Sequence, residues 1–548
     1  MAGKITSAQH RFKISKIFTI MASNTLPPPA PNHTRHTLPP ESELRIEVPF
    51  GVTCTVTLRG GGGTASSTGG SAEIFGAEIA PERPIRLTAT KVAIFTWHGC
   101  TLDVSDEDKL DIVYVSEETD ANVAYVNTHA QLEAMRDEAL ASLLPANNPQ
   151  QGMLSDNKHD GDNDNSDVEG PRVLLVGPAD CGKSSLARVL SSYAVKLGRT
   201  PLLVDLDASQ NMLSVPGTMT VCPISADGIS AESNGTASLM MSGGGGGNNN
   251  AVMPFVLWYG SQDLNDHPDL YKAQLDKMGK TIDGRLSGDV DARASGIIVN
   301  ASGLIEDVGY TYLLHAIDAF RINVVIVLGH DRLYSMLGTH FKKQAQQQQQ
   351  QNEDTTTVEV VKVTKQPKLI KLPRSGGVVS RDAAFRRALR SQCIKRYFYG
   401  DTIPPKPTDA TPASTSAAAS TQYRFTPSLI EVPFADVQLH QLSNISLSAS
   451  MLPVSAKQST DPIQLTTLSS SDITPKLNHA VLAVCHPSAV EKYEQSGRAR
   501  DLYLSGIAGF VAVEKVDVSK EVLSLLSPCA GSLPSQHLLV GDNITWVE

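Results

Sequence analysis

The sequence contains little that would support a disulfide-linked, zinc-binding or membrane-embedded protein. Its seven cysteines are odd in number and never spaced C-x-x-C, and they lie at Cys54, Cys100, Cys181, Cys222, Cys393, Cys485 and Cys529. This usage predicts reduced thiols inside a cell and argues against a disulfide framework or a zinc site. No apolar run approaches the ~18–20 residues that span a bilayer. We therefore expect a soluble intracellular chain with no membrane contact.

An excess of basic charge is also missing. The net charge is −10, so no global basic field attracts nucleic acid, and any such contact needs a local patch. Residues 1–40 hold no acidic residue and include Lys4, Arg11, Lys13 and Lys16. They could mimic a mitochondrial presequence, yet they lack a clear amphipathic, Arg-rich helix. Because a Pro-rich run follows, a disordered tail is the preferred interpretation.

Composition divides the 548 residues into several regions of an α/β protein. Alternating apolar and polar residues predict a β-sandwich or barrel over residues 41–120, followed by a helix and an acidic linker over 121–170. Apolar strands that alternate with helices predict a parallel sheet over 171–400. A flexible excursion over 401–422 then leads to a small β-rich domain over 423–548. Further loop insertions are expected at 60–70, 225–250 and 344–351.

The most informative segment is Gly177–Ser184, which fits the phosphate-binding pattern G-x-x-x-x-G-K-[ST]. An apolar run typical of a buried strand precedes it, and a helical pattern follows. A loop in this place points backbone N–H groups and the positive helix end at a polyphosphate. Lys183 can then reach the terminal phosphates, and the Ser184 hydroxyl can bind Mg²⁺. A chance match in a Gly-containing turn is the alternative, and the flanking pattern disfavours it.

Two other groups of residues predict phosphate chemistry. Asp205 and Asp207 end the next predicted strand, where an acidic residue typically holds Mg²⁺ or accepts a proton from the nucleophile. They could instead be simple strand-end caps. A predicted helix and the loop before it are rich in basic residues: Arg381, Arg386, Arg387, Arg390, Lys395 and Arg396. This segment predicts a lid that neutralises the charge of the phosphates, and a solvated basic face is equally consistent with it.

Seven strings beyond the phosphate-binding loop carry a resemblance to a known family. They are ELRIE (43–47), AEIFG (72–76), FTWHGC (95–100), NTHAQLEAMR (127–136), YAVKLGR (193–199), SGGVV (375–379) and KRYFYG (395–400). With these strings the chain resembles the polynucleotide 5′-hydroxyl kinase family, in its branch belonging to the pre-mRNA cleavage and polyadenylation machinery. The resemblance implies a central P-loop domain between an N-terminal β domain and a C-terminal domain.

The same resemblance implies roles for individual residues. Those at the positions of Glu43 and Lys91 reach the nucleotide base, and Asp207 is the carboxylate that activates an RNA hydroxyl. The ATP-binding loop residues correspond to Asp180, Cys181, Gly182, Lys183, Ser184 and Ser185. Mg²⁺ is expected on Ser184 and Asp207, and Lys183 and Asp207 are the catalytic candidates. Cys181 is interpreted as filling space, with an acidified thiol as the alternative.

One difference from the family pattern favours ATP binding without RNA kinase activity. Active members clasp a base with tryptophan in a segment Asn-x-x-Gly-Trp, whereas here Asn300 and Gly303 are followed by Leu304. Leucine has no π-face, and a stacked base contributes ~1–3 kcal/mol. Trp258 lies on another predicted strand and is expected in the core. Cys393 stands where active lids tend to be basic.

The resulting hypothesis is a nuclear, ATP-binding cleavage-factor subunit in which ATP is mainly structural. An active RNA 5′-hydroxyl kinase is the alternative, and a nucleolar branch of the family is a weaker one. Expected partners are other cleavage-factor subunits, especially the one that binds the polymerase tail, with RNA as a further candidate.

Overall fold

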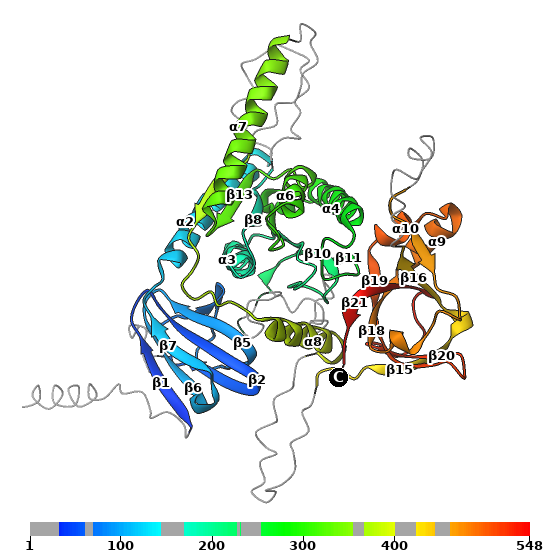
Figure 1. The fold of residues 1–548 in the computed structure, drawn as a ribbon. Coiled ribbons are helices and arrows are strands. Elements are labelled where there is room, and N and C mark those ends of the chain that lie inside the picture. The colour runs from blue at the N-terminus through cyan, green and yellow to red at the C-terminus, as the bar shows by residue number, and fades with distance from the viewer. Residues whose placement is uncertain are drawn as a thin grey trace, which may run out of the picture. The chain divides into compact units, whose positions relative to one another are not determined.

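The structure is a computed structural model that describes residues 32–60, 70–143, 169–226, 229, 231, 254–354, 366–400, 423–443 and 461–547, with only the backbone of 348–354. Residues 1–31, most of the acidic linker and the excursion 401–422 therefore lie outside the described residues. The chain forms two compact units, one made chiefly of residues 1–119 and one that begins at residue 120 (Figure 1). Among the described helices, none is both long and apolar enough to cross a bilayer.

The first unit is the expected N-terminal β domain. Its strands are β1 His33–Leu38, β2 Ser42–Leu58, β3 Glu73–Ile74, β4 Ala77–Glu78, β5 Pro84–Thr96, β6 Cys100–Ser105 and β7 Ile112–Ser116. The long strand β2 pairs with β5 along most of its length, with β7 near its start and with β6 near its end. The apolar residues that alternate along the start of β2, Leu44, Ile46 and Val48, are all buried, and the polar Glu43 and Arg45 beside them are buried too.

The predicted start of this domain at residue 41 is too late. Strand β1 pairs antiparallel with β6 in full register, from His33 opposite Ser105 to Leu38 opposite Cys100. The segment was expected in a disordered tail because of the neighbouring Pro-rich run. Its backbone hydrogen bonds with β6 are non-local, so local composition does not reveal them.

The second unit contains a seven-stranded sheet in the order β11-β10-β9-β12-β8-β13-β14. The strands are β8 Arg172–Val176, β9 Leu202–Asp205, β10 Thr218–Pro223, β11 Phe255–Trp258, β12 Ile297–Asn300, β13 Val324–Leu328 and β14 Lys368–Leu372. Five neighbouring strands, from β9 to β14, are parallel, as expected. Strand β10 pairs antiparallel with both β9 and the edge strand β11, so the sheet is mixed.

Helices cover both faces of this sheet. They are α2 Asp120–Leu143, α3 Lys183–Lys196, α4 Pro268–Gly288, α5 Val290–Ser295, α6 Val308–Ala319, α7 Asp331–Asp354 and α8 Ala383–Tyr399. Helices α2 and α3 pack against the face that carries Val173 and Leu175. Helices α4, α6 and α7 pack against the opposite face, which carries Leu174 and Val176. The continuous apolar run of β8 is explained by burial on both sides.

The prediction for the glutamine tract 344–351 was wrong. The tract was expected to be a loop insertion, but the structure continues α7 through it to Asp354. Glutamine is a good helix former, so a helix that has already started at Asp331 extends through it at little cost.

The C-terminal part of this unit is a second seven-stranded sheet with two short helices. In sheet order the strands are β15 Ser428–Pro433, β20 Val522–Ser527, β19 Ile507–Asp517, β18 Ala480–Cys485, β21 His537–Thr545, β16 Gln438–Leu442 and β17 Leu465–Thr467. Only β16 and β21 pair in parallel among these strands. The helices are α9 Pro487–Ser496 and α10 Ala499–Tyr503.

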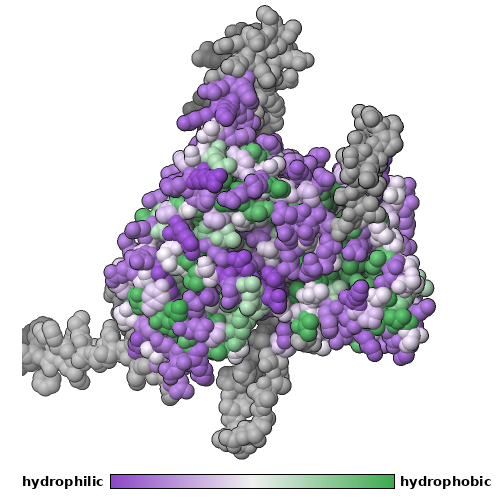
Figure 2. Space-filling model, in the orientation of Figure 1, coloured by the Kyte–Doolittle hydropathy of each residue, from purple (hydrophilic) through white to green (hydrophobic). Residues whose placement is uncertain are grey.

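The two sheets of the second unit share one hydrophobic core. Leu482 and Val484 of β18 face a core of the C-terminal sheet itself. Val481 and Ala483 face the cluster that also holds the α4 and α6 side chains. In that shared core the Trp258 and Phe510 rings lie 5.7 Å apart. Figure 2 shows that the outer surface in this view is mostly hydrophilic, with apolar residues in separate groups.

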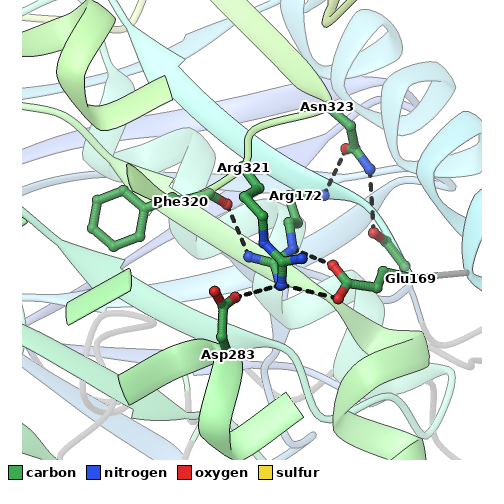
Figure 3. A network of polar contacts seen from close by, with 7 residues as sticks. Glu169, Arg172, Asp283, Phe320, Arg321 and Asn323 are labelled. Atoms are coloured by element: carbon green, nitrogen blue, oxygen red, sulfur yellow. Dashed lines mark hydrogen bonds and ion pairs between the residues drawn. The ribbon is translucent and has the colours of Figure 1, made fainter. Parts of the chain in front are cut away.

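A polar network lies at the edge of the sheet where β8 begins (Figure 3). The buried Arg172 donates to Glu169 at 2.6 Å, to Asp283 at 2.8 Å and to the Phe320 carbonyl oxygen at 2.9 Å. The exposed Arg321 contacts the same two carboxylates. Asn323 accepts a hydrogen bond from the backbone N–H of Arg172 at 2.7 Å. We call these residues the Arg172 network.

Candidate nucleotide-binding site

The phosphate-binding loop connects the end of β8 to the start of α3. Gly182 precedes the helix with φ +98, a conformation that side chains rarely adopt. At Gly177, an added Cβ would come within 2.8 Å of both the Cys181 Sγ and the Leu328 carbonyl oxygen. Two of the motif glycines are therefore required by the backbone path, which leaves the α3 N-terminus open to an anion.

Lys183 is folded over this loop. Its Nζ donates to the carbonyl oxygens of Gly177 at 2.8 Å and Pro178 at 2.7 Å, and the side chain is buried. Burial lowers the pKa of Lys183 below its ordinary value. A bound polyphosphate would provide the strong negative partner that two neutral carbonyl groups lack, and it would favour the charged ammonium.

Ser184, Asn300 and Asp205 form a polar group beside the loop. The Asn300 Nδ2 donates to Asp205 Oδ1 at 2.9 Å and approaches Ser184 Oγ at 3.3 Å. Asp205 also accepts from the backbone N–H of Met212 at 2.6 Å. Burial and the charge of Asp207 raise the pKa of Asp205 to about 7, although its hydrogen-bond donors act in the opposite direction. A cation nearby would keep this carboxylate ionised.

Asp207 lies two residues beyond the end of β9 and is partly exposed. Its Oδ1 accepts from the Ser209 backbone N–H at 3.0 Å, from Ser209 Oγ at 2.7 Å and from the Gln210 backbone N–H at 3.3 Å. The Oδ1 atom therefore caps a turn, which agrees with the alternative interpretation of Asp207 as a strand-end cap. Among the described residues, the Oδ2 atom accepts no hydrogen bond and stays available to a ligand.

The lid lies against the phosphate-binding loop. The Asp180 carboxylate accepts from the Arg386 Nη2 at 2.6 Å and from the Arg381 backbone N–H at 3.1 Å. A Cβ placed on Gly182 would lie 3.0 Å from the Val378 Cγ2. Burial lowers the pKa of Arg381, with the Arg386 charge acting in the same direction and Asp180 opposing it. The sequence left open whether this helix is solvated, and the structure places Arg386 of the helix and Arg381 of the segment before it at the phosphate-binding loop.

Cys181, Cys393 and Ser185 are the remaining residues that the sequence singled out near this site. Cys181 is buried within an apolar cluster, which supports the space-filling interpretation. Cys393 donates to the Ser214 carbonyl oxygen at 3.3 Å, and burial raises the pKa of its thiol to about 11. Ser185 is partly exposed in the first turn of α3.

The segment that follows β12 lies beside the phosphate-binding loop. A Cβ on Gly303 would meet the Ala179 Cα and backbone nitrogen at 2.9 Å. Leu304 next to it is partly buried and packs against the shared core. Trp258 is fully buried in that core, as expected, and offers no exposed ring face to a base. The structure thus has an aliphatic side chain where the family resemblance expects a base-stacking aromatic.

Glu43 and Lys91 belong to the other compact unit. Glu43 Oε1 accepts from Arg45 Nε at 2.6 Å, and Lys91 Nζ pairs with Glu47 Oε2 at 2.7 Å. They lie on the neighbouring strands β2 and β5. Their contact with a nucleotide base stays a prediction.

The oxygen atoms at this site fit a magnesium ion that arrives with a polyphosphate. Mg²⁺ prefers hard oxygen ligands and is usually held by one or two protein groups plus phosphates and water. Ser184 and the carboxylates of Asp205 and Asp207 supply such oxygens. The described residues contain no cluster of three or more His, Cys, Asp or Glu side chains that would hold a metal without a ligand.

Strand, glycine-rich loop and helix, with Lys183 in the loop and acidic residues after the next strand, define a P-loop nucleotide-binding protein. Comparison with known families gives three matches in chain order. The N-terminal beta-sandwich domain of polyadenylation factor matches residues 37–139, the mRNA cleavage and polyadenylation factor CLP1 P-loop matches 177–353, and the pre-mRNA cleavage complex II protein Clp1 matches 425–548. The chain belongs to the Clp1 family of mRNA cleavage and polyadenylation factors.

Relatives and solved structures agree with this assignment over most of the chain. The mRNA cleavage and polyadenylation factor clp1 of Aspergillus niger is 33% identical over 520 residues, which cover 93% of this chain and 94% of that protein. A CLP1 homolog of Arabidopsis thaliana is 32% identical over 513 residues, or 93% of each chain. A solved Clp1p in complex with Pcf11p has a TM-score of 0.69 at 22% identity, covering 95% of this chain and 100% of that one. The predicted family and three-part fold are confirmed.

Proposed function

We propose that this protein is an ATP-binding subunit of the pre-mRNA 3′-end cleavage and polyadenylation complex, with ATP acting mainly as a structural ligand. The family membership supports the process. The observation that carries the ligand role is the closed contact of Asp180 with Arg381 and Arg386 beside Lys183. This contact joins the lid to the phosphate-binding loop, so a triphosphate bound there would hold both elements and stabilise them by mass action.

The proposed ligand is ATP with Mg²⁺. The loop Asp180–Ser185 would hold the phosphates, and Ser184 and Asp207 would hold the ion. Glu43 and Lys91 would contact the base from the N-terminal domain, in line with the family resemblance. When bound, Mg²⁺ neutralises phosphate charge and orients the β- and γ-phosphate oxygens. We also propose the domain division 41–120, 171–400 and 423–548, with the first domain extended to residue 33 by β1.

The proposed partner is another cleavage-factor subunit. The solved Clp1p structure described above and a second one, which has a TM-score of 0.68 to this chain, both hold Clp1p together with Pcf11p. One of them is described as giving the structural basis for ATP loss in a point mutant. For this chain we propose an equivalent partner, the subunit that binds the polymerase tail, and a nuclear location that follows from the process.

Catalysis of RNA 5′-hydroxyl phosphorylation is the second candidate function. Lys183 and Asp207 are retained, and one oxygen of Asp207 accepts no hydrogen bond among the described residues. Leu304, however, offers no π-face for the acceptor base, and a displacement of ~1 Å can reduce the rate ~10²-fold. We propose that transfer is absent or very weak while ATP remains bound.

The first experiment identifies and removes the nucleotide. Purified protein is denatured, the released nucleotide is identified by chromatography, and the melting temperature is measured in parallel. Lys183→Met should reduce both ATP content and melting temperature, whereas the exposed Lys280→Met on α4 should change neither. A Lys183→Met variant with full ATP content and an unchanged melting temperature would contradict the structural-ligand proposal.

The second experiment separates the two functions. Labelled phosphate transfer to short 5′-hydroxyl RNA is measured for the wild type, Leu304→Trp and Asp207→Ala. We expect no robust transfer from the wild type. Strong wild-type transfer that Asp207→Ala abolishes would restore the kinase. Affinity purification from nuclear extract tests the partner, and recovery without any 3′-end processing subunit would count against it.

A further inference from the structure

Asn300 is a fully buried amide at the end of β12, between the strand that leads into the phosphate-binding loop and the strand that ends at Asp205. In register it pairs with Leu175 of β8 and with Asp205 of β9. The carboxyl ends of parallel strands are where α/β sheets bind ligands. In the sequence, Asn300 stands out only as the start of the Asn-x-x-Gly segment, which by itself indicates no role at the site.

The hydrogen bonds around Asp205 orient the Asn300 amide. Each Asp205 oxygen already accepts a backbone N–H group, Oδ1 from Asp207 and Oδ2 from Met212. The Asn300 NH₂ group faces Asp205 and donates to Oδ1, and the same nitrogen approaches the Ser184 hydroxyl. Both N–H bonds of the amide are thereby used within the protein.

The amide oxygen is left without a donor. The Asn300 Oδ1 is buried and has no hydrogen-bond partner among the described residues, although the side chain is 0% exposed. A buried acceptor without a partner costs about 1–3 kcal/mol. Such an atom beside a phosphate-binding loop indicates that its donor comes with the ligand.

The chemistry of Mg²⁺·ATP limits which group can donate to the Asn300 Oδ1. The phosphate oxygens of ATP are hydrogen-bond acceptors, so the triphosphate chain offers no donor to this oxygen. Water bound to Mg²⁺ is a donor, and Mg²⁺ usually keeps several waters in nucleotide sites. Ser184, the expected protein ligand of the ion, already contacts the other end of the same amide.

We propose that Asn300 is a positioning residue of the Mg²⁺·ATP site: its NH₂ group holds Ser184 and Asp205, and its Oδ1 accepts a hydrogen bond from a Mg²⁺-bound water. This inference rests on the proposed binding of ATP. Groups that orient metal ligands in this way typically contribute 10–100-fold to metal affinity. The contribution of Asn300 is therefore specific to the magnesium complex.

The test compares ATP affinity with and without Mg²⁺. Full-length protein stripped of nucleotide is titrated calorimetrically with ATP in Mg²⁺ and with ATP in EDTA, for the wild type, Asn300→Ala and Asn300→Ser. The matched control is Asn323→Ala, since Asn323 is an amide of the Arg172 network at the opposite edge of the same sheet. Asn300→Ser keeps a small polar group, and it provides the measurement if Asn300→Ala does not fold.

The expected result is a change in one ratio. The ratio of affinities in Mg²⁺ and in EDTA should fall by about 10-fold or more in the Asn300 variants and stay within about 2-fold in Asn323→Ala. Equal losses with and without Mg²⁺ would overturn the inference, because they would assign Asn300 to the loop or to Lys183 instead. An unchanged ratio in a variant would also overturn it. A wild type that binds no ATP in either buffer would instead defeat the proposed function.

Discussion

The Arg172 network provides a stability prediction that is independent of any ligand. Arg172→Met removes three side-chain hydrogen bonds, to Glu169, Asp283 and the Phe320 carbonyl oxygen. The Arg172 side chain is 1% exposed, whereas that of Arg321 is 53% exposed. Removing one partner of a buried ion pair costs about 3–5 kcal/mol. We expect about 3 kcal/mol here, because the two carboxylates are partly exposed and keep Arg321.

The matched control is Arg321→Met, which removes a cation from the same two carboxylates at the surface. An exposed pair of this kind contributes about 0–1 kcal/mol. Urea unfolding followed by intrinsic tryptophan fluorescence, to which the buried Trp258 and Trp546 of this unit contribute, measures both variants. With a slope of about 3 kcal/mol per molar, Arg172→Met should lower the midpoint by about 1 M and Arg321→Met by less than half of that. Equal shifts for the two variants would refute the reasoning from burial.

Three further outcomes follow from other parts of the second unit. Burial lowers the pKa of His440 to about 4, below the ~6.5 of an unfolded histidine, so the unfolded chain binds the proton first as the pH falls. Stability should therefore drop between about pH 6.5 and 4, and His440→Phe should flatten a plot of melting temperature against pH. Tyr397→Phe should destabilise by about 1–3 kcal/mol in chemical denaturation, since it leaves the backbone N–H of Phe510 without its 3.0 Å acceptor. Gly303→Ala should weaken ATP binding in calorimetry, because its Cβ meets the backbone of the phosphate-binding loop at 2.9 Å, whereas Gly284→Ala, with open space around it, should bind ATP as the wild type does.

The sequence was sufficient where local pattern and burial coincide. The apolar run of β8, the glycine spacing and the helical pattern after Lys183 predicted the loop, and the structure has this strand–loop–helix unit. Strand β10 and its antiparallel pairing with β9 and β11 were not predicted, although a strand holding Trp258 was expected. The residues between β10 and β11 had been assigned to a long insertion, which separates these two partners along the chain. Non-local pairing also explains why β1 was missed.

At the candidate site, residue types were easier to predict than contacts. Lys183, Ser184 and Asp207 were identified by the motif and by their place after strands. The bond between Asp180 and Arg386 joins residues that are 206 positions apart, and no local pattern reveals it. Asn300 was passed over because a single asparagine is a weak signal. Its position at the carboxyl end of a central parallel strand was the one available clue.

The core shared by the two sheets of the second unit restricts how the gene can be divided. Trp258 from the edge strand β11 lies against Phe510 of β19, and Phe398 of α8 stacks on Trp546 at a ring distance of 5.5 Å. A fragment that stops before residue 423 would expose these rings to solvent, and so would one that begins there. Expression boundaries, proteolytic fragments and recombination points within this unit should therefore fall outside the pair of sheets, and the two sheets should be inherited and produced together.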